Sequence, residues 1–166
     1  QATLFFLYLL ILLAAILGQD ILLEPFGGEA FGMTVQETTR ITSIWGGCVL
    51  LALLLAGMLE SRIGKRRVAQ AGALTALAGF LMIATSPPLD SLSVFYGGIL
   101  LLGTGTGLST VSNLSLMLDM TAHGSVGLFM GAWGMSNAFS RLVGSLVAGA
   151  IRDVLTQFFT SAVVGY

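Results

Sequence analysis

The chain has 166 residues, of which 55% are hydrophobic and 9% are charged, and its mean hydropathy is +0.94. A soluble domain carries about 25% charged residues, so this composition indicates an integral membrane protein. The formal net charge of −1 argues against a nucleic-acid partner, which requires a basic surface. Cys48, the only cysteine, lies in an apolar run, so neither a disulfide framework nor a cysteine metal site is predicted.

The two ends of the sequence predict a fragment of a longer protein. The chain begins at Gln1 rather than at a methionine, and it stops at Tyr166 inside a new apolar run. No signal peptide is predicted, because no basic region precedes the first apolar run and no small-residue cleavage site follows it.

Five apolar segments are long enough to cross a bilayer, which takes about 20 helical residues. We therefore predict an all-α, polytopic transmembrane bundle with helices over residues 3–24, 39–59, 68–85, 92–118 and 126–151, and the start of a sixth over 154–166. Pro25-Phe-Gly-Gly is expected to end the first helix. Pro87-Pro88 is expected to separate the third helix from the fourth, and Thr121-Ala-His-Gly124 the fourth from the fifth.

The distribution of basic residues predicts the orientation of the helices. Four of the seven basic residues lie between the second and third helices, and they are Arg62, Lys65, Arg66 and Arg67. This loop is therefore expected on the cytoplasmic side. The loop over 25–38 and the turn over 86–91 then lie outside, and the loop over 119–124 lies inside. Arg152 falls outside beside Asp153, as a minor exception to the rule.

The cytoplasmic loop has a specific order of residues. GMLESRIGKRR over 57–67 resembles the loop signature G-x-x-x-[D/E]-R-x-G-[R/K]-[R/K] of the major facilitator superfamily, which joins two helices in each half of those proteins. The resemblance rests on the order of Gly57, Glu60, Arg62, Gly64, Lys65 and Arg66, although Glu60 stands one position before the acidic residue of the signature. The first glycine is expected to permit close helix contact, and the acid and the arginine to pair with a neighbouring helix end. A plain basic loop is the alternative.

Carboxylates stand near the outer end of the first predicted span. Asp20, preceded by Gln19, and Glu24 are four residues apart and share a helix face. A carboxylate near hydrocarbon is costly unless it faces the bundle interior, water or a partner. We therefore consider proton coupling or ligation of a cation or cofactor metal, with an interfacial pair that reaches the lipid headgroups as the alternative.

A second polar set lies on the fifth predicted helix. Trp133, Asn137 and Arg141 follow one another at four-residue spacing and share a face. Arg141 lies deep in the span and needs a partner, for which Asp20 and a ligand oxygen are candidates. The alternative for this set is structural hydrogen bonding between helices, worth about 1 kcal/mol.

Asn113 and His123 complete the candidate binding residues. Asn113, with Ser109 and Ser112 near it, is predicted either to line the same cavity or to make an interhelical hydrogen bond. A neutral imidazole is a natural axial ligand for the metal of a tetrapyrrole. His123, the only histidine, lies in a short loop, however, and this position favours a solvated side chain.

The glycines are placed for helix packing. Gly103 and Gly107 are four residues apart, as are Gly127 and Gly131, so each pair shares a helix face. Small residues at this spacing let transmembrane helices approach closely. No phosphate-binding glycine loop and no Ser/His/Asp arrangement is present, so an enzyme is not predicted.

Several segments together resemble the bacteriochlorophyll delivery family, the PucC/LhaA-type branch of the major facilitator superfamily. They are QDILLEPFGGEAFGM over 19–33, ESRIGKRR over 60–67, GTGLSTVSNLSLMLDMT over 105–121 and GLFMGAWGMSNAFSRLVGSLVAGAIRD over 127–153. The resemblance implies twelve helices in two six-helix halves, of which this chain would be the C-terminal half. It also implies a thylakoid or intracytoplasmic photosynthetic membrane. Transporter folds of this kind place their site at the midplane between the halves.

The resemblance further implies a protein that binds or delivers chlorophyll or bacteriochlorophyll and assists the assembly of light-harvesting or photosystem complexes. Its partners would be subunits of those complexes, the pigment and the lipid membrane, with no metal ion of its own. Our own hypothesis, which the family pattern does not fix, is that Asp20, Glu24 or Asn113 ligates the pigment magnesium, with His123 less favoured, and that Trp133 and Phe139 pack on the ring.

Two other functions stay open. One is a proton-coupled transporter of small solutes, in which Asp20 and Arg141 govern proton movement. The other is a structural subunit docked on a photosystem. The sparse polar residues at the predicted midplane favour pigment handling over solute transport.

Overall fold

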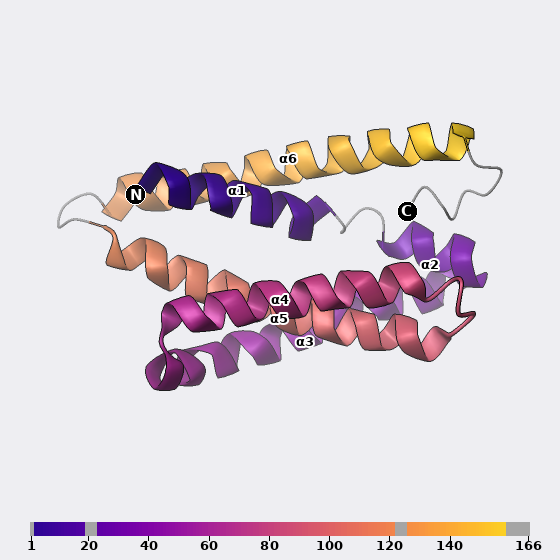
Figure 1. Cartoon of the computed structure of the whole chain (residues 1–166), viewed down its shortest axis with the longest axis horizontal. Coiled ribbons are helices and arrows are strands. Elements are labelled where there is room, and N and C mark those ends of the chain that lie inside the picture. Colours follow the sequence, from indigo (N-terminus) through magenta and orange to yellow (C-terminus); the bar gives the residue numbers. More distant parts are fainter. Residues whose placement is uncertain (1, 19–22, 122–125, 159–166) are drawn as a thin grey trace. The chain divides into compact units, whose positions relative to one another are not determined.

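The computed structural model describes residues 2–18, 23–121 and 126–158, and over these ranges it confirms the all-α fold. The helices are α1 (Ala2–Gly18), α2 (Leu23–Phe31), α3 (Val35–Ile63), α4 (Lys65–Thr85), α5 (Leu92–Asp119) and α6 (Val126–Phe158), drawn in Figure 1. Among the described residues, α3, α4 and α5 are each long and apolar enough to cross a membrane. A shorter apolar stretch, Leu7–Ile16, lies within α1.

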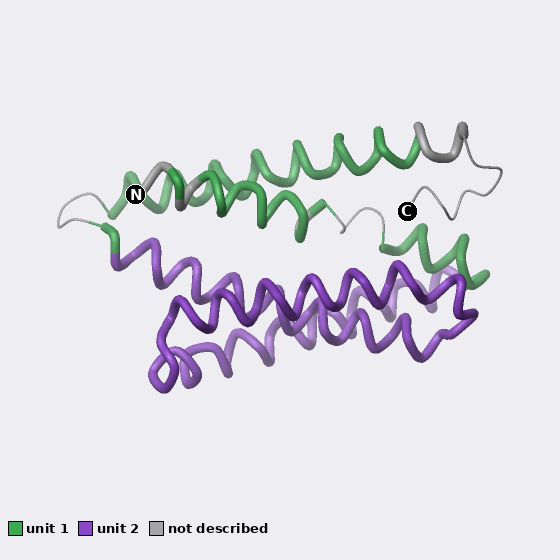
Figure 2. The backbone as a smooth tube through the Cα atoms, in the orientation of Figure 1, with its two compact units in different colours: residues 1–33, 120–166 green, residues 34–119 purple. Residues whose placement is uncertain are grey.

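The chain divides into two compact units, which Figure 2 shows in separate colours. Residues 34–119 form one unit, which holds α3, α4 and α5, and in it α5 packs along both other helices. Residues 1–33 and 120–166 form the other unit, in which α1 packs along α6. The first unit is continuous in sequence, whereas the second joins helices from the two ends of the chain.

The region around Pro25 differs from the prediction. Instead of one helix over 3–24 that stops at Pro25-Phe-Gly-Gly, α1 ends at Gly18, and a separate helix, α2, includes Pro25 and both glycines. Pro25 is the third residue of α2, where a backbone N–H has no intrahelical acceptor to lose. The first turn of α2 therefore tolerates Pro25, although this proline was expected to end a helix.

The start of α3 is fixed by a capping box. The Thr34 N–H donates to Glu37 Oε2 at 2.8 Å, and the Glu37 N–H donates to Thr34 Oγ1 at 3.4 Å. This reciprocal pair satisfies two donors that a helix start otherwise leaves open. It places the start of α3 at Val35, four residues before the predicted start, and α3 continues to Ile63 rather than residue 59.

The end of α6 also differs from the prediction. A break near Ile151 and a new helix from Val154 were expected, but α6 continues through both residues to Phe158. Neither glycine nor proline occurs between Ile151 and Phe158, so the sequence there contains no residue that stops a helix. The predicted residues 159–166 lie outside the described ranges.

Within the unit of α3 to α5, glycines bring the α4 and α5 backbones together. A Cβ added at Gly72 would lie 2.6 Å from the Ser109 nitrogen, and one added at Gly79 would lie 2.6 Å from the Leu102 nitrogen. Ordinary Cβ contacts are 3.4 Å or longer. The two helices are therefore closer than any side chain at these positions would allow, which maximises van der Waals contact between them.

Within the other unit, α1 and α6 make a similar contact. A Cβ added at Gly18 would lie 3.0 Å from the Gly144 carbonyl carbon. Ser140 is fully buried, and its hydroxyl donates to the Leu10 carbonyl at 3.0 Å. Leu9 and Ile16 are buried in the same unit. Close backbone approach and the hydrogen bond between Ser140 and Leu10 therefore join helices that are more than 100 residues apart in sequence.

Candidate functional site

The α3–α4 hairpin carries the motif residues of the predicted cytoplasmic loop. Gly64 alone separates the two helices, and its φ of 87° lies in the region that favours glycine. Its N–H donates to the Glu60 carbonyl at 3.0 Å, which closes the last turn of α3. Gly57 differs from the prediction, because among the described residues nothing lies within 4 Å of a Cβ added there.

The charged residue of the hairpin that pairs with a neighbouring helix end is Lys65, whereas Glu60 and Arg62 were expected to do so. Lys65 Nζ lies 2.6 Å from Asp119 Oδ1, so the first residue of α4 is tied to the last residue of α5. Glu60 Oε1 is buried and accepts no hydrogen bond from the described residues. The Lys65–Asp119 pair holds the start of α4 close to the end of α5. The predicted topology places the loops at these two helix ends on the same side of the membrane.

The two glycine pairs have different surroundings. A Cβ at Gly103 would lie 2.7 Å from the Trp45 carbonyl oxygen, and one at Gly107 would lie 2.6 Å from the Val49 carbonyl oxygen, so this pair faces α3. Among the described residues, nothing lies within 4 Å of a Cβ added at Gly127 or Gly131. Within the described residues, the α5 pair therefore contacts another helix of its unit, and the α6 pair does not.

Asn113 belongs to a buried polar turn of α5 in the unit of residues 34–119. Asn113 is 1% exposed, and Ser109 and Ser112 are equally buried. Asn113 Oδ1 and both serine hydroxyl oxygens make no hydrogen bond within the described part of the chain. Buried polar atoms without partners are rare and costly, so this turn is polar beyond the needs of helix packing.

The candidate residues on α6 belong to the other unit. Trp133 and Asn137 are half-buried, and the Asn137 side-chain amide donates to the Trp133 carbonyl at 2.9 Å. This hydrogen bond lies within α6 rather than between helices. Arg141, which was expected deep in the span, is exposed in this unit.

Three sequence-predicted site residues, Gln19, Asp20 and His123, lie outside the described residues. Glu24 lies in the first turn of α2 and is half-buried. The structure adds an ion pair that the sequence analysis missed, between Arg152 Nη2 of α6 and Glu29 Oε1 of α2, at 3.1 Å. Both residues were assigned to the outer side by the predicted topology, and that shared assignment was the only signal for the pair.

Successive apolar helices, close glycine contacts and few polar side chains define a polytopic α-helical membrane protein. The match to the PUCC protein family extends over residues 1–166, and the chain belongs to this family. The resemblance recognised in the sequence is thereby confirmed.

Individual relatives agree with this assignment. The chain is 37% identical over 137 residues to Protein PucC of Cereibacter sphaeroides, which covers 82% of this chain and 30% of that protein. It is 36% identical over 138 residues to Protein PucC of Rhodovulum sulfidophilum, with 82% and 30% covered. It is 28% identical over 171 positions to a Rhodobacter capsulatus protein named bacteriochlorophyll synthase 44.5 kDa chain, with 98% and 39% covered. The chain thus spans 30% to 39% of these relatives' length, and no solved structure matches it.

Proposed function

We propose that the protein binds or delivers chlorophyll or bacteriochlorophyll and assists the assembly of light-harvesting or photosystem complexes in a photosynthetic membrane. The observation that carries this proposal is the PUCC family match over residues 1–166. It is supported by a relative whose name refers to bacteriochlorophyll. The proposed role is binding and assembly rather than catalysis, and the chain is proposed to act as the C-terminal half of a twelve-helix protein.

The pigment presents a large apolar ring and a magnesium that takes oxygen ligands. Glu24 offers a half-buried carboxylate. Phe139 on α6 is 51% exposed and Trp133 is half-buried, so both offer an aromatic surface to a flat ring. These residues suit the pigment, and all belong to the unit that contains α1, α2 and α6.

Asn113 suits the pigment less well, although its side-chain oxygen has no hydrogen-bond partner among the described residues. Because Asn113 is 1% exposed within closely packed helices, a macrocycle reaches it only if α5 separates from its neighbours. We therefore assign pigment contact to Glu24, Trp133 and Phe139. The bound pigment would supply the absorbance, and the chain would supply an oxygen ligand and an apolar surface.

The test is an absorption spectrum of the full-length protein, purified in mild detergent, with the molar ratio of tetrapyrrole to protein. We expect a chlorophyll band that persists through detergent washing and weakens in the Asp20→Asn/Glu24→Gln double variant. Asp90→Asn is the matched control, because it removes an exposed carboxylate from the α4–α5 turn, and it should leave the ratio unchanged.

Two outcomes would overturn pigment binding. A colourless protein that still co-purifies with a photosystem would indicate a docked structural subunit. A colourless protein without such a partner would indicate solute transport, for which Asp20→Asn should abolish substrate-driven proton movement and leave folding intact.

A further inference from the structure

We propose that the tip of the α3–α4 hairpin binds the headgroup of an anionic phospholipid. The hairpin tip is defined here by four basic residues and three exposed apolar residues beside them, namely Arg62, Lys65, Arg66, Arg67, Leu55, Met58 and Ile63. The proposal concerns the unit of residues 34–119 and does not depend on pigment binding.

The charge of the tip is the first part of the argument. Lys65 is paired with Asp119, whereas Arg62, Arg66 and Arg67 are exposed, and none has an ion-pair partner among the described residues. The carboxylates at this end of the unit are Glu60 on α3 and Asp119 on α5. Four basic groups and two carboxylates give this end of the unit a net positive charge. The exposed part of that charge lies on the three guanidinium groups.

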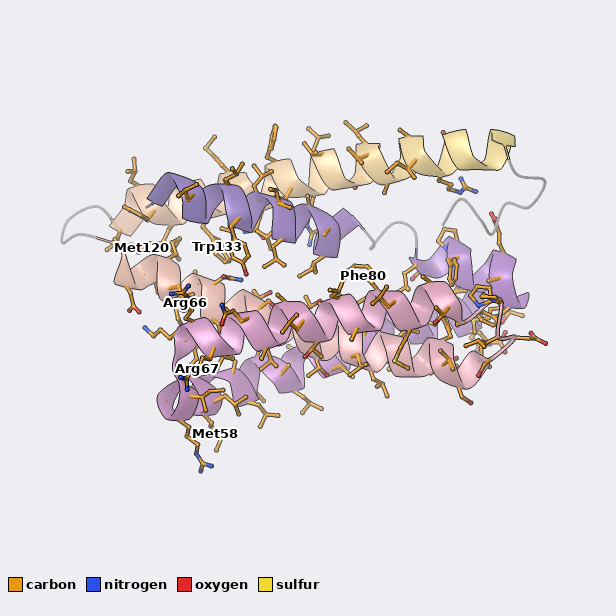
Figure 3. All side chains as sticks on the ribbon, in the orientation of Figure 1. Met58, Arg66, Arg67, Phe80, Met120 and Trp133 are labelled. Atoms are coloured by element: carbon orange, nitrogen blue, oxygen red, sulfur yellow. The ribbon has the colours of Figure 1, made fainter. Side chains whose placement is uncertain are left out.

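The chemistry of these groups selects phosphate. A guanidinium group binds a phosphate through two parallel hydrogen bonds, which an ammonium group does not match. Arg62 lies in the last turn of α3, and Arg66 and Arg67 lie in the first turn of α4, with the single residue Gly64 between the helices. The short connection therefore gathers the three arginines at one end of the unit. Figure 3 shows Arg66 and Arg67 at the start of α4 and Met58 near the end of α3.

The apolar neighbours of the arginines distinguish a phospholipid from free phosphate or an acidic peptide. Met58 is 59% exposed, Leu55 is 52% exposed and Ile63 is 45% exposed, all within the last three turns of α3. Since α3 and α4 are both long and apolar enough to span a bilayer, the tip would stand where the hydrocarbon ends and the headgroups begin. Arginines above exposed apolar side chains match a phosphate that is attached to acyl chains.

The size of the effect follows from the number of arginines. Near an anionic surface each basic residue contributes about 1 kcal/mol, which is about a fivefold change in affinity. Loss of two to three such contacts should weaken binding by about 25-fold to 125-fold at low salt, and by less as the salt concentration rises.

The experiment uses the purified full-length protein in mild detergent. Phosphatidylglycerol or phosphatidylcholine with identical acyl chains is added, and the bound lipids are counted by native mass spectrometry. We expect the parent to retain phosphatidylglycerol in clear preference, and R62Q/R66Q/R67Q to lose that preference. R40Q is the matched control, because Arg40 is an exposed arginine near the opposite end of α3.

Several outcomes would overturn the proposal. A parent protein without preference between the two lipids does so regardless of whether any variant folds. An unchanged preference for phosphatidylglycerol in R62Q/R66Q/R67Q would also overturn it. An equal loss of that preference in R40Q would do the same. Complete displacement of the lipid by millimolar inorganic phosphate would show that the arginines bind phosphate alone. The tetrapyrrole ratio of the same samples reports on the proposed function separately.

Discussion

The close contact between α4 and α5 makes Gly79→Ala a sharp test of the structure. The added Cβ would lie 2.6 Å from the Leu102 nitrogen and 2.8 Å from the Gly98 carbonyl oxygen, both of which are backbone atoms that no side-chain rotation moves. To reach an ordinary contact of 3.4 Å, the helices must separate locally by about 0.8 Å, the difference between 3.4 and 2.6 Å. Overpacking of this kind costs about 1–3 kcal/mol.

A control substitution at a second glycine separates the clash from the higher helix propensity of alanine. Alanine is favoured over glycine in a helix by about 1 kcal/mol, which partly masks the clash. Gly47→Ala on α3 gains the same preference without a clash, since among the described residues nothing lies within 4 Å of its added Cβ. The free energies of unfolding of the two variants should therefore differ by about 1–3 kcal/mol, with Gly79→Ala the less stable.

The assay is SDS-induced unfolding of the full-length protein in mild detergent, followed by helical circular dichroism. Gly79→Ala should lower the SDS midpoint relative to the parent or leave it near the parent value, and Gly47→Ala should raise it. Equal midpoints for the two variants would refute the close α4–α5 contact.

Three further predictions use the same unfolding assay. Gly64→Ala should destabilise by about 1–3 kcal/mol, because the φ of 87° at Gly64 is strained for any residue with a Cβ, and a neutral result would contradict the hairpin geometry. Lys65→Gln and Asp119→Asn should show a coupling of about 0.2–1 kcal/mol in a double-mutant cycle, since these side chains are 36% and 55% exposed. That coupling should shrink in high salt, and a salt-independent value would show that the pair is not electrostatic. Ser140→Ala should cost about 1 kcal/mol through loss of the hydrogen bond to the Leu10 carbonyl, and an unchanged midpoint would argue against that bond.

The helix boundaries that the sequence predicted best are the two on either side of Pro87-Pro88. Pro87-Pro88 predicted the end of one helix at residue 85, where α4 ends, and the start of the next at residue 92, where α5 begins. The start of α3 was missed by four residues, although Thr34 and Glu37 have the spacing of a capping box. Hydropathy alone located the apolar part of the helix and passed over its polar first turn.

Long-range pairs were beyond the reach of the sequence pattern. Lys65 and Asp119 are 54 residues apart, and only the folded unit brings them together. The glycines of α4 at positions 72 and 79 and those of α5 at 98 and 105 are each seven residues apart, which is two helical turns. This spacing indicates a helix face suited to close packing. It does not indicate which other helix packs against that face.

The candidate site was less predictable than the fold. Asn137 was expected to reach a ligand or another helix, but its amide donates to a carbonyl of its own helix, as polar side chains often do. Residue spacing places a side chain on a face but does not determine which acceptor it chooses. The polar turn around Asn113 was noticed in the sequence, whereas its complete burial follows from packing between helices.

The hydrogen bond between Ser140 and Leu10 has a consequence for biosynthesis. The two residues are 130 positions apart, whereas α3, α4 and α5 follow one another directly in the chain. At a synthesis rate of about 5–20 residues per second, α6 is completed on the order of ten seconds after α1. The α3–α5 unit can assemble during that interval, before α6 covers the Leu10 carbonyl and the Gly18 surface of α1.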